Sequence, residues 1–183
     1  DGVLSYLQWA DNQSSRTNKS IQNYQPWFNM GSLEDKLTPI TCPQAMDTRL
    51  FFFKTNQDIV PSNRFLLVKP YGDVELLLGL LNSSITKIVI ESHGRVTGGG
   101  AINLSGSDLR SLRVLNPKSL SDRQASKVKD GFEKITNGDG DGLNDIDEVV
   151  INALDLDVTT DEVQQMAETI KQTRRNKGQE VEP

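Results

Sequence analysis

An acidic, glycine-rich stretch, residues 137–148, constrains this chain more than any other feature of its sequence. It reads Asn-Gly-Asp-Gly-Asp-Gly-Leu-Asn-Asp-Ile-Asp-Glu, with a helical pattern on each side. Counted from Asn137, oxygen-bearing side chains fall at positions 1, 3, 5, 9 and 12, and Gly142 falls at position 6, where a calcium loop turns sharply. A hard cation takes about six to eight oxygens, which one loop supplies only by curling around the ion. The spacing therefore predicts a calcium site.

The expected calcium ligands follow from these positions. They are the side chains of Asn137, Asp139 and Asp141, the backbone carbonyl of Leu143, the carboxylate of Asp145 directly or through a water, and both oxygens of Glu148. Without the ion, the carboxylates of this loop would repel one another. The alternative interpretation is an acidic surface turn that binds no specific ligand.

The segment resembles an EF-hand loop, and more closely the D-x-D-x-D-G-x-x-D-x-x-E calcium loops of thrombospondin type 3-like and dockerin-like repeats in secreted proteins. The resemblance covers the loop and its flanking helices, and it implies Ca²⁺ as the cofactor. Two positions depart from the pattern: position 1 is Asn137 instead of Asp, and position 8 is Asn144 instead of an apolar residue. These departures predict a solitary loop that acts as a structural clamp.

Composition narrows the class of partner. The net charge of the 183 residues is −5, and a negative net charge argues against a nucleic-acid partner. No apolar run is long enough to span a bilayer. Cys42 is the one cysteine, so an internal disulfide and a cysteine-rich metal site are excluded. A calcium loop of modest affinity suits a compartment where calcium is abundant, so we expect a secreted or extracellular protein with an unidentified protein partner.

Three segments are predicted along the chain. Residues 1–48 are polar and irregular and are expected to form an N-terminal cover, residues 49–118 an α/β core, and residues 119–183 a helix-loop-helix calcium-binding region with a C-terminal helix. Capping-box patterns at 121–124 and 159–162 start two helices, the first running to about Ile135, and Ile146 to Leu154 form the helix after the loop.

The predicted core is a small, mostly parallel sheet with helices. Leu50–Phe53, Arg64–Val68 and Ile85–Ile90 have the composition of buried strands, and Asp73–Leu81 has the spacing and acidic start of a short helix. A strand, a helix and another strand in this order favour a right-handed parallel unit with functional groups at the carboxyl ends of its strands.

The one histidine, His93, follows the third of these predicted strands. The apolar run, the Ser-His-Gly after it and the later Leu104-Ser105-Gly106 resemble the histidine strand of caspase-like (clan CD) cysteine peptidases over residues 85–109. That family places its catalytic cysteine after the histidine, and no cysteine follows His93 here. The resemblance therefore implies an inactive relative of that family, or a fragment that lacks the nucleophile.

Cys42 offers a second route to catalysis. Papain-like hydrolases and deamidases place the cysteine before the histidine and complete the site with Asp or Asn, an order matched by Cys42, His93 and either Asn103 or Asp108. The ordinary alternatives are a buried, inert thiol and a histidine that stabilises a turn. Three functions stay open: a calcium-stabilised secreted binding module, a cysteine hydrolase or deamidase using Cys42 and His93, and an inactive caspase-like domain.

Overall fold

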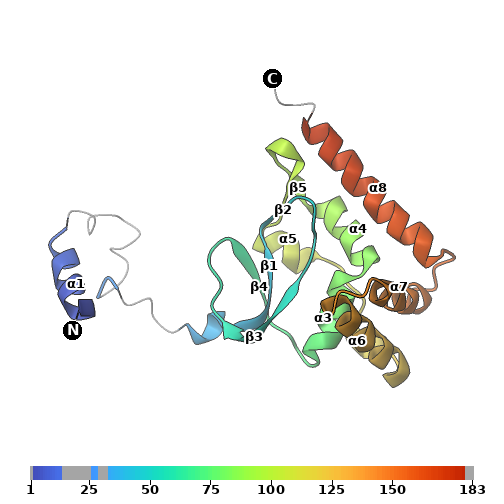
Figure 1. Ribbon diagram of the computed structural model, residues 1–183, viewed down its shortest axis with the longest axis horizontal. Coiled ribbons are helices and arrows are strands. Elements are labelled where there is room, and N and C mark those ends of the chain that lie inside the picture. Colours follow the sequence, from blue (N-terminus) through green and yellow to red (C-terminus); the bar gives the residue numbers. More distant parts are fainter. Residues whose placement is uncertain (1, 14–25, 29–32, 180–183) are drawn as a thin grey trace. The chain divides into compact units, whose positions relative to one another are not determined.

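The computed structural model of the chain describes residues 2–13, 26–28 and 33–179. The chain forms two compact units, Asp1–Leu37 and Thr38–Pro183, coloured from blue to red along the sequence in Figure 1. Residues 38–48 belong to the second unit, since β1 (Thr38–Pro43) is the central strand of its larger sheet. The second unit also spans both of the other predicted segments, 49–118 and 119–183.

The first unit contains helix α1 (Gly2–Asp11) and the 3-10 helix η2 (Glu34–Lys36). The indole Nε1 of Trp27 donates a hydrogen bond to Oδ1 of Asp11 at 2.7 Å, which ties residues 26–28 to the end of α1. Much of the predicted irregular cover, residues 14–25 and 29–32, lies outside the described residues.

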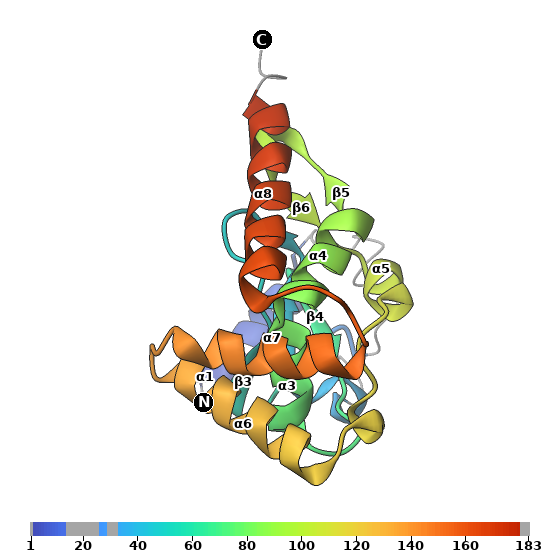
Figure 2. The same ribbon diagram turned by 90° about the vertical axis from the view of Figure 1, so that its right-hand side faces the viewer.

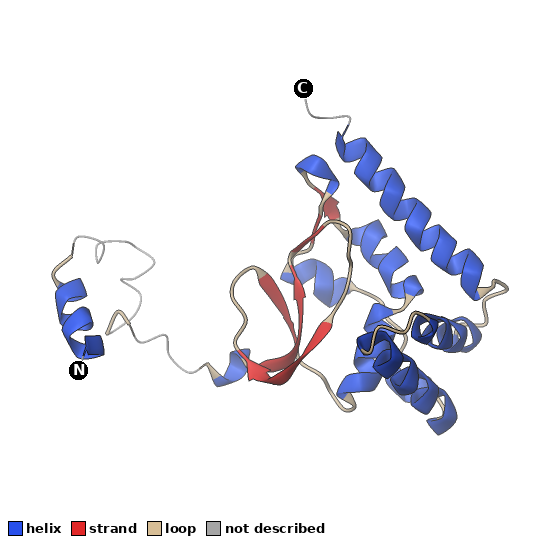
Figure 3. Ribbon diagram, in the orientation of Figure 1, coloured by secondary structure: helices blue, strands red, loops and turns tan. Residues whose placement is uncertain are grey.

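Two small antiparallel sheets form the β part of the second unit, drawn in red in Figure 3. In the larger sheet, β3 (Phe53–Ile59) and β4 (Phe65–Val68) flank β1. The smaller has the order β2-β6-β5 and is built from the short strands Ala45–Met46, Ile102–Asn103 and Arg95–Val96. Every strand pair among the described residues is antiparallel, so the predicted parallel sheet is wrong, although the mixed α/β class is confirmed.

The parallel prediction failed at residues 85–90, which form part of helix α4 (Ser84–His93) and not a strand. Ser83 ends α3 (Val74–Asn82) and at the same time caps α4, because its side chain accepts a hydrogen bond from the backbone N–H of Thr86. The β-branched run Ile88-Val89-Ile90 has strand propensity, but the cap and the burial of Thr86 and Ile90 on one helix face outweigh it.

The predicted helices of the C-terminal half are present. Helix α6 (Asp122–Thr136) starts with the Ser121–Gln124 capping box, and α8 (Thr160–Gln179) starts with reciprocal hydrogen bonds between Thr159 and Glu162. Helix α7 (Asp141–Ala153) begins at Asp141 instead of Ile146. Figure 2 shows α8 running beside α4, with α6 and α7 lying together across one end of that pair.

One hydrophobic core joins the larger sheet to the helices. Its fully buried members come from the sheets, from the residue after β6, from α3 and α4, and from α6 and α7: Ile40, Cys42, Ile102, Leu104, Leu78, Leu80, Ile90, Val128 and Ile146. The unit also contains the short elements η3 (Gly98–Gly100), α5 (Gly106–Ser111) and η4 (Pro117–Ser119). None of the helices in the described ranges is long and apolar enough to cross a bilayer.

Candidate functional site

The predicted calcium ligands lie on a tight helical hairpin. Residues Asn137 to Gly140 connect α6 to α7, and loop positions 5 to 12 are all helical, because α7 begins at Asp141. Asp141, Asp145 and Glu148 share one face of α7 and are spread along about 10 Å of its axis. No three acidic, histidine or cysteine side chains of the described residues gather closely enough to hold a metal ion.

The carboxylates at loop positions 9 and 12 are paired with lysines of α6. Lys134 Nζ lies 2.6 Å from Asp145 Oδ2, and Lys127 Nζ lies 2.7 Å from Glu148 Oε2 and 3.7 Å from Asp145 Oδ1. Asp139 Oδ1 accepts a hydrogen bond from the backbone N–H of Asp141 at 3.0 Å. In this arrangement the residues do not form a calcium shell, and calcium binding stays a prediction from the sequence.

Cys42 lies at the centre of the larger sheet. Its side chain is completely buried, and burial raises the pKa of its thiol to about 12. The nucleophile of a cysteine hydrolase is the thiolate, which a thiol with this pKa does not supply at neutral pH. Cys42 lies opposite Leu66 of β4 and belongs to the same hydrophobic core as Ile40.

His93 lies at the other predicted catalytic position, at the C-terminal end of α4. Its Nδ1 is 2.9 Å from the carbonyl oxygen of Val89 and 3.0 Å from the hydroxyl of Ser92. Both partners belong to the same helical turn, so the ring caps its own helix end. Of the two residues predicted as the third member, Asn103 lies in β6 opposite Ala45, and Asp108 forms the capping box of α5 with Ser105. None of the contacts found among the described residues joins His93 to Cys42 or to Asp108.

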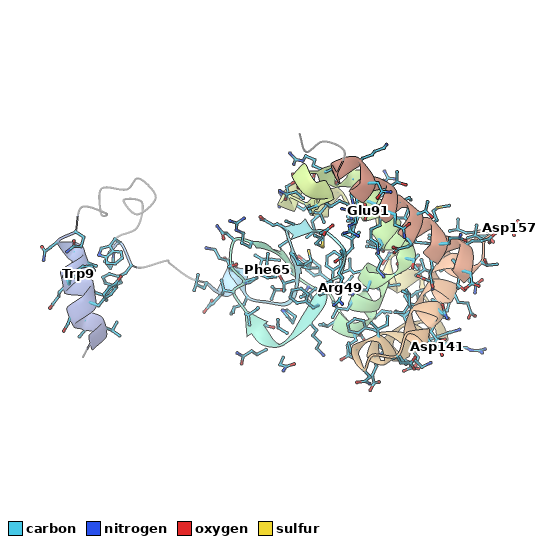
Figure 4. The ribbon with its side chains drawn as sticks, turned by 45° about the horizontal axis from the view of Figure 1, so that its top comes forward. Trp9, Arg49, Phe65, Glu91, Asp141 and Asp157 are labelled. Atoms are coloured by element: carbon cyan, nitrogen blue, oxygen red, sulfur yellow. The ribbon has the colours of Figure 1, made fainter. Side chains whose placement is uncertain are left out.

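A cleft of about 810 Å³ that carries both apolar and charged groups lies between the sheet edge and the helices of the second unit. One wall consists of residues 48–54, which include three consecutive phenylalanines. The opposite walls come from α4, from the α6–α7 hairpin and from α8. In Figure 4, Arg49 and Glu91 lie in the middle of this unit, between the sheet and the helices.

Lys87 of α4 lines this cleft, and its ammonium group has no hydrogen bond or ion pair with any described residue. Burial lowers the pKa of its ammonium group, and the positive charge of Lys171 on α8 lowers it further, against the opposing effect of the Asp147 carboxylate on α7. Asp147 does not pair directly with Lys87, because its oxygens accept hydrogen bonds from the Ser84 backbone N–H at 2.8 Å and from Gln164 at 3.0 Å.

The other charged groups of the cleft are mostly paired. Glu91 accepts hydrogen bonds from Arg174 at 2.8 and 3.2 Å, and both side chains are buried. Lys171 pairs with Glu168, and Lys54 pairs with Glu75 at 2.8 Å. Arg49 is exposed and, like Lys87, has no ion pair within the described part of the chain.

Neither Lys87 nor Arg49 was among the site residues predicted from the sequence. A signal was present for Lys87, because it is the one charged residue within the apolar run of residues 85–90. The prediction of a strand for this run did not indicate where the Lys87 side chain lies. Because the run is a helix, Lys87 lies on the wall of the cleft.

Comparisons with known proteins found no matching family model, no matching curated protein and no matching solved structure.

Proposed function

We propose that this chain is a binding module whose ligand site is the cleft beside Lys87, and that its ligand is a small organic anion with an apolar or aromatic part. The observation that carries this proposal is the unpaired, half-buried ammonium group of Lys87. An ammonium group that has lost water without gaining a partner is unfavourable in the free protein. A carboxylate, sulfonate or phosphate bound beside it supplies the missing partner.

The size and walls of the cleft support the second part of the proposal. A volume of about 810 Å³ falls within the range of small-molecule sites, which are typically apolar with a few well-placed polar groups. Phe51 is 39% exposed, and Phe53 lies beside it with ring centroids 5.3 Å apart. These rings offer a flat apolar surface to a ligand, while Arg49 adds a second cation at the rim.

This proposal keeps the binding-module interpretation of the sequence and places its site in the cleft. The cysteine hydrolase or deamidase has less support, because Cys42 is buried with a raised pKa. The inactive caspase-like domain has less support as well, because residues 85–90 form a helix instead of the histidine strand of that family. A role for calcium and a location outside the cytosol remain predictions.

Two dyes that differ in one charged group test the proposal. The first is 8-anilinonaphthalene-1-sulfonate, an aromatic anion, and the second is N-phenyl-1-naphthylamine, which has nearly the same rings and no sulfonate. The variant Lys87→Met keeps an unbranched side chain and removes the charge, and Lys118→Met is the matched control at an exposed lysine without an ion pair.

We expect the wild type to bind the sulfonate more tightly than the neutral dye. Lys87→Met should weaken the sulfonate about tenfold, because a hydrogen bond to a charged group contributes roughly 1.5–3 kcal/mol. The affinity of the neutral dye should change little, and Lys118→Met should leave both affinities unchanged. Equal affinities of the two dyes for the wild type, or an equal effect of the two variants on the sulfonate, would contradict an anion site at Lys87.

A further inference from the structure

We propose that the α6–α7 hairpin holds its shape without a metal ion, and that Lys127 and Lys134 supply to its acidic face the positive charge that calcium supplies in an EF-hand-type loop. This inference is independent of the cleft. It rests on three features of residues 127–148: how α6 ends, why Gly142 is a glycine, and where the two lysines lie.

The first feature is the end of α6. The backbone N–H of Asp139 donates to the carbonyl of Lys134 at 2.9 Å, and that of Gly138 donates to the carbonyl of Ile135 at 3.0 Å. Gly138 has a φ of 84°, in the left-handed region that favours glycine. These two hydrogen bonds and this φ define a Schellman motif, the common way in which a helix stops. The backbone of the first loop positions is therefore used to end a helix.

The second feature is the role of Gly142. In a calcium loop the glycine at position 6 makes the sharp turn, whereas Gly142 lies inside α7 and has no positive φ. A Cβ atom at Gly142 would collide with the backbone oxygen of Gly131 on α6. A Cβ atom at Gly131 would in turn lie 2.7 Å from the Gly142 oxygen. The two glycines therefore let the helices touch through their backbones, which is a packing requirement and not a turn requirement.

The third feature is the placement of the lysines. Lys127 and Lys134 are seven residues apart on α6 and so point from the same face toward α7. Their ammonium groups contact the carboxylates of Asp145 and Glu148, which a calcium ion would need. Calcium would have to displace both lysines and would then lie close to two positive charges. The acidic face is thus already neutralised from within the hairpin.

The test combines calcium titration calorimetry with thermal unfolding, in excess calcium and in chelator. It uses the wild type, the double variant Lys127→Gln/Lys134→Gln, and Asp141→Asn as the variant of the proposed calcium loop. We expect the wild-type melting temperature to be the same in calcium and in chelator. We expect the lysine variant to melt lower in chelator, by roughly 2–4 °C, and to bind calcium at least about tenfold more tightly than the wild type.

Two results would overturn the proposal. A wild-type melting temperature that rises by several degrees in calcium, with the rise lost in Asp141→Asn, would establish a calcium loop in place of the metal-free hairpin. A lysine variant with an unchanged melting temperature and an unchanged calcium affinity would show that the two lysines do not have the proposed role. The glycine contact is tested separately below.

Discussion

The cleft and the α6–α7 hairpin both contain lysines, but the hairpin lysines are in ion pairs and the cleft lysine Lys87 is not. On the hairpin, Lys127 and Lys134 lie within 2.7 Å of carboxylate oxygens and remain partly exposed to water. In the cleft, Lys87 is half-buried, and none of the described residues offers it an ion-pair partner. The hairpin lysines are therefore part of the structure, whereas Lys87 is available to a ligand.

The pKa shifts of these lysines agree with that contrast. The hydrogen bond to Asp145 raises the pKa of Lys134, which favours its charged form. Burial lowers the pKa of Lys87, which disfavours its charged form in the absence of a ligand. Ionisable groups whose pKa is shifted by burial cluster at functional sites. A bound anion would stabilise the charged form of Lys87, whereas the hairpin lysines already have carboxylate partners.

The largest effect should come from the buried ion pair between Arg174 of α8 and Glu91 of α4. Replacing Arg174 by Met leaves the Glu91 carboxylate without its partner in the core and should lower the free energy of unfolding by about 3–5 kcal/mol. Arg175→Met is the control, because the Arg175–Asp47 pair is exposed and contributes less than about 1 kcal/mol. If urea unfolding shows that both variants lose the same free energy of unfolding, the buried pair contributes no more to stability than the exposed pair.

The next effect concerns the backbone contact of the hairpin. Gly142→Ala and Gly131→Ala should each lower the free energy of unfolding by about 2–3 kcal/mol in chelator, because the added Cβ forces α6 and α7 apart. Gly140→Ala is the control, since no atom outside its neighbours lies within 4 Å of a Cβ there. A Gly131→Ala variant as stable as the wild type would contradict the close crossing.

The third variant should stabilise the protein, whereas most substitutions destabilise it. Lys87→Met should raise the free energy of unfolding by about 0.5–1 kcal/mol at neutral pH, because it removes an unpaired charge and keeps the apolar contacts. The same variant should bind the anionic dye more weakly. A variant that loses both stability and binding would indicate that Lys87 has a structural partner in the folded protein.

The pH dependence of Lys87 gives a further test. Its pKa is lowered in the folded state from the ordinary 10.5, so between the two values the unfolded chain binds more protons. Stability contributed by this group therefore rises as the pH rises through that window. The difference in free energy of unfolding between Lys87→Met and the wild type should shrink from neutral pH toward pH 10.5, as measured by denaturant titration. A constant difference would contradict the shift.

The smallest effect belongs to a single hairpin lysine. Lys134→Gln should lower the free energy of unfolding only slightly at low salt, because both members of the pair with Asp145 are partly exposed. High salt should remove most of this difference by screening the pair. A loss that persists in high salt would mean that Lys134 stabilises the hairpin by packing and not by charge.

Local signals in the sequence determined much of the helical part. Asp73 caps α3, Ser121 and Gln124 cap α6, and Thr159 and Glu162 cap α8, each through hydrogen bonds that span only two or three residues. Because such contacts need no distant partner, the pattern alone was enough to predict them. Strand β4 was likewise predicted from its apolar composition.

Long-range packing decided the rest. The run 85–90 forms a helix whose buried face packs against the core. This removes the parallel sheet and turns Lys87 toward the cleft. The acidic stretch shows the same division. Its composition and the helices on both sides could be predicted from the sequence, whereas the place of Gly142 inside α7, its contact with Gly131 and the reach of Lys127 to Glu148 depend on how two helices cross. Spacing along a chain fixes which groups are available, and only the tertiary structure brings those groups to their partners.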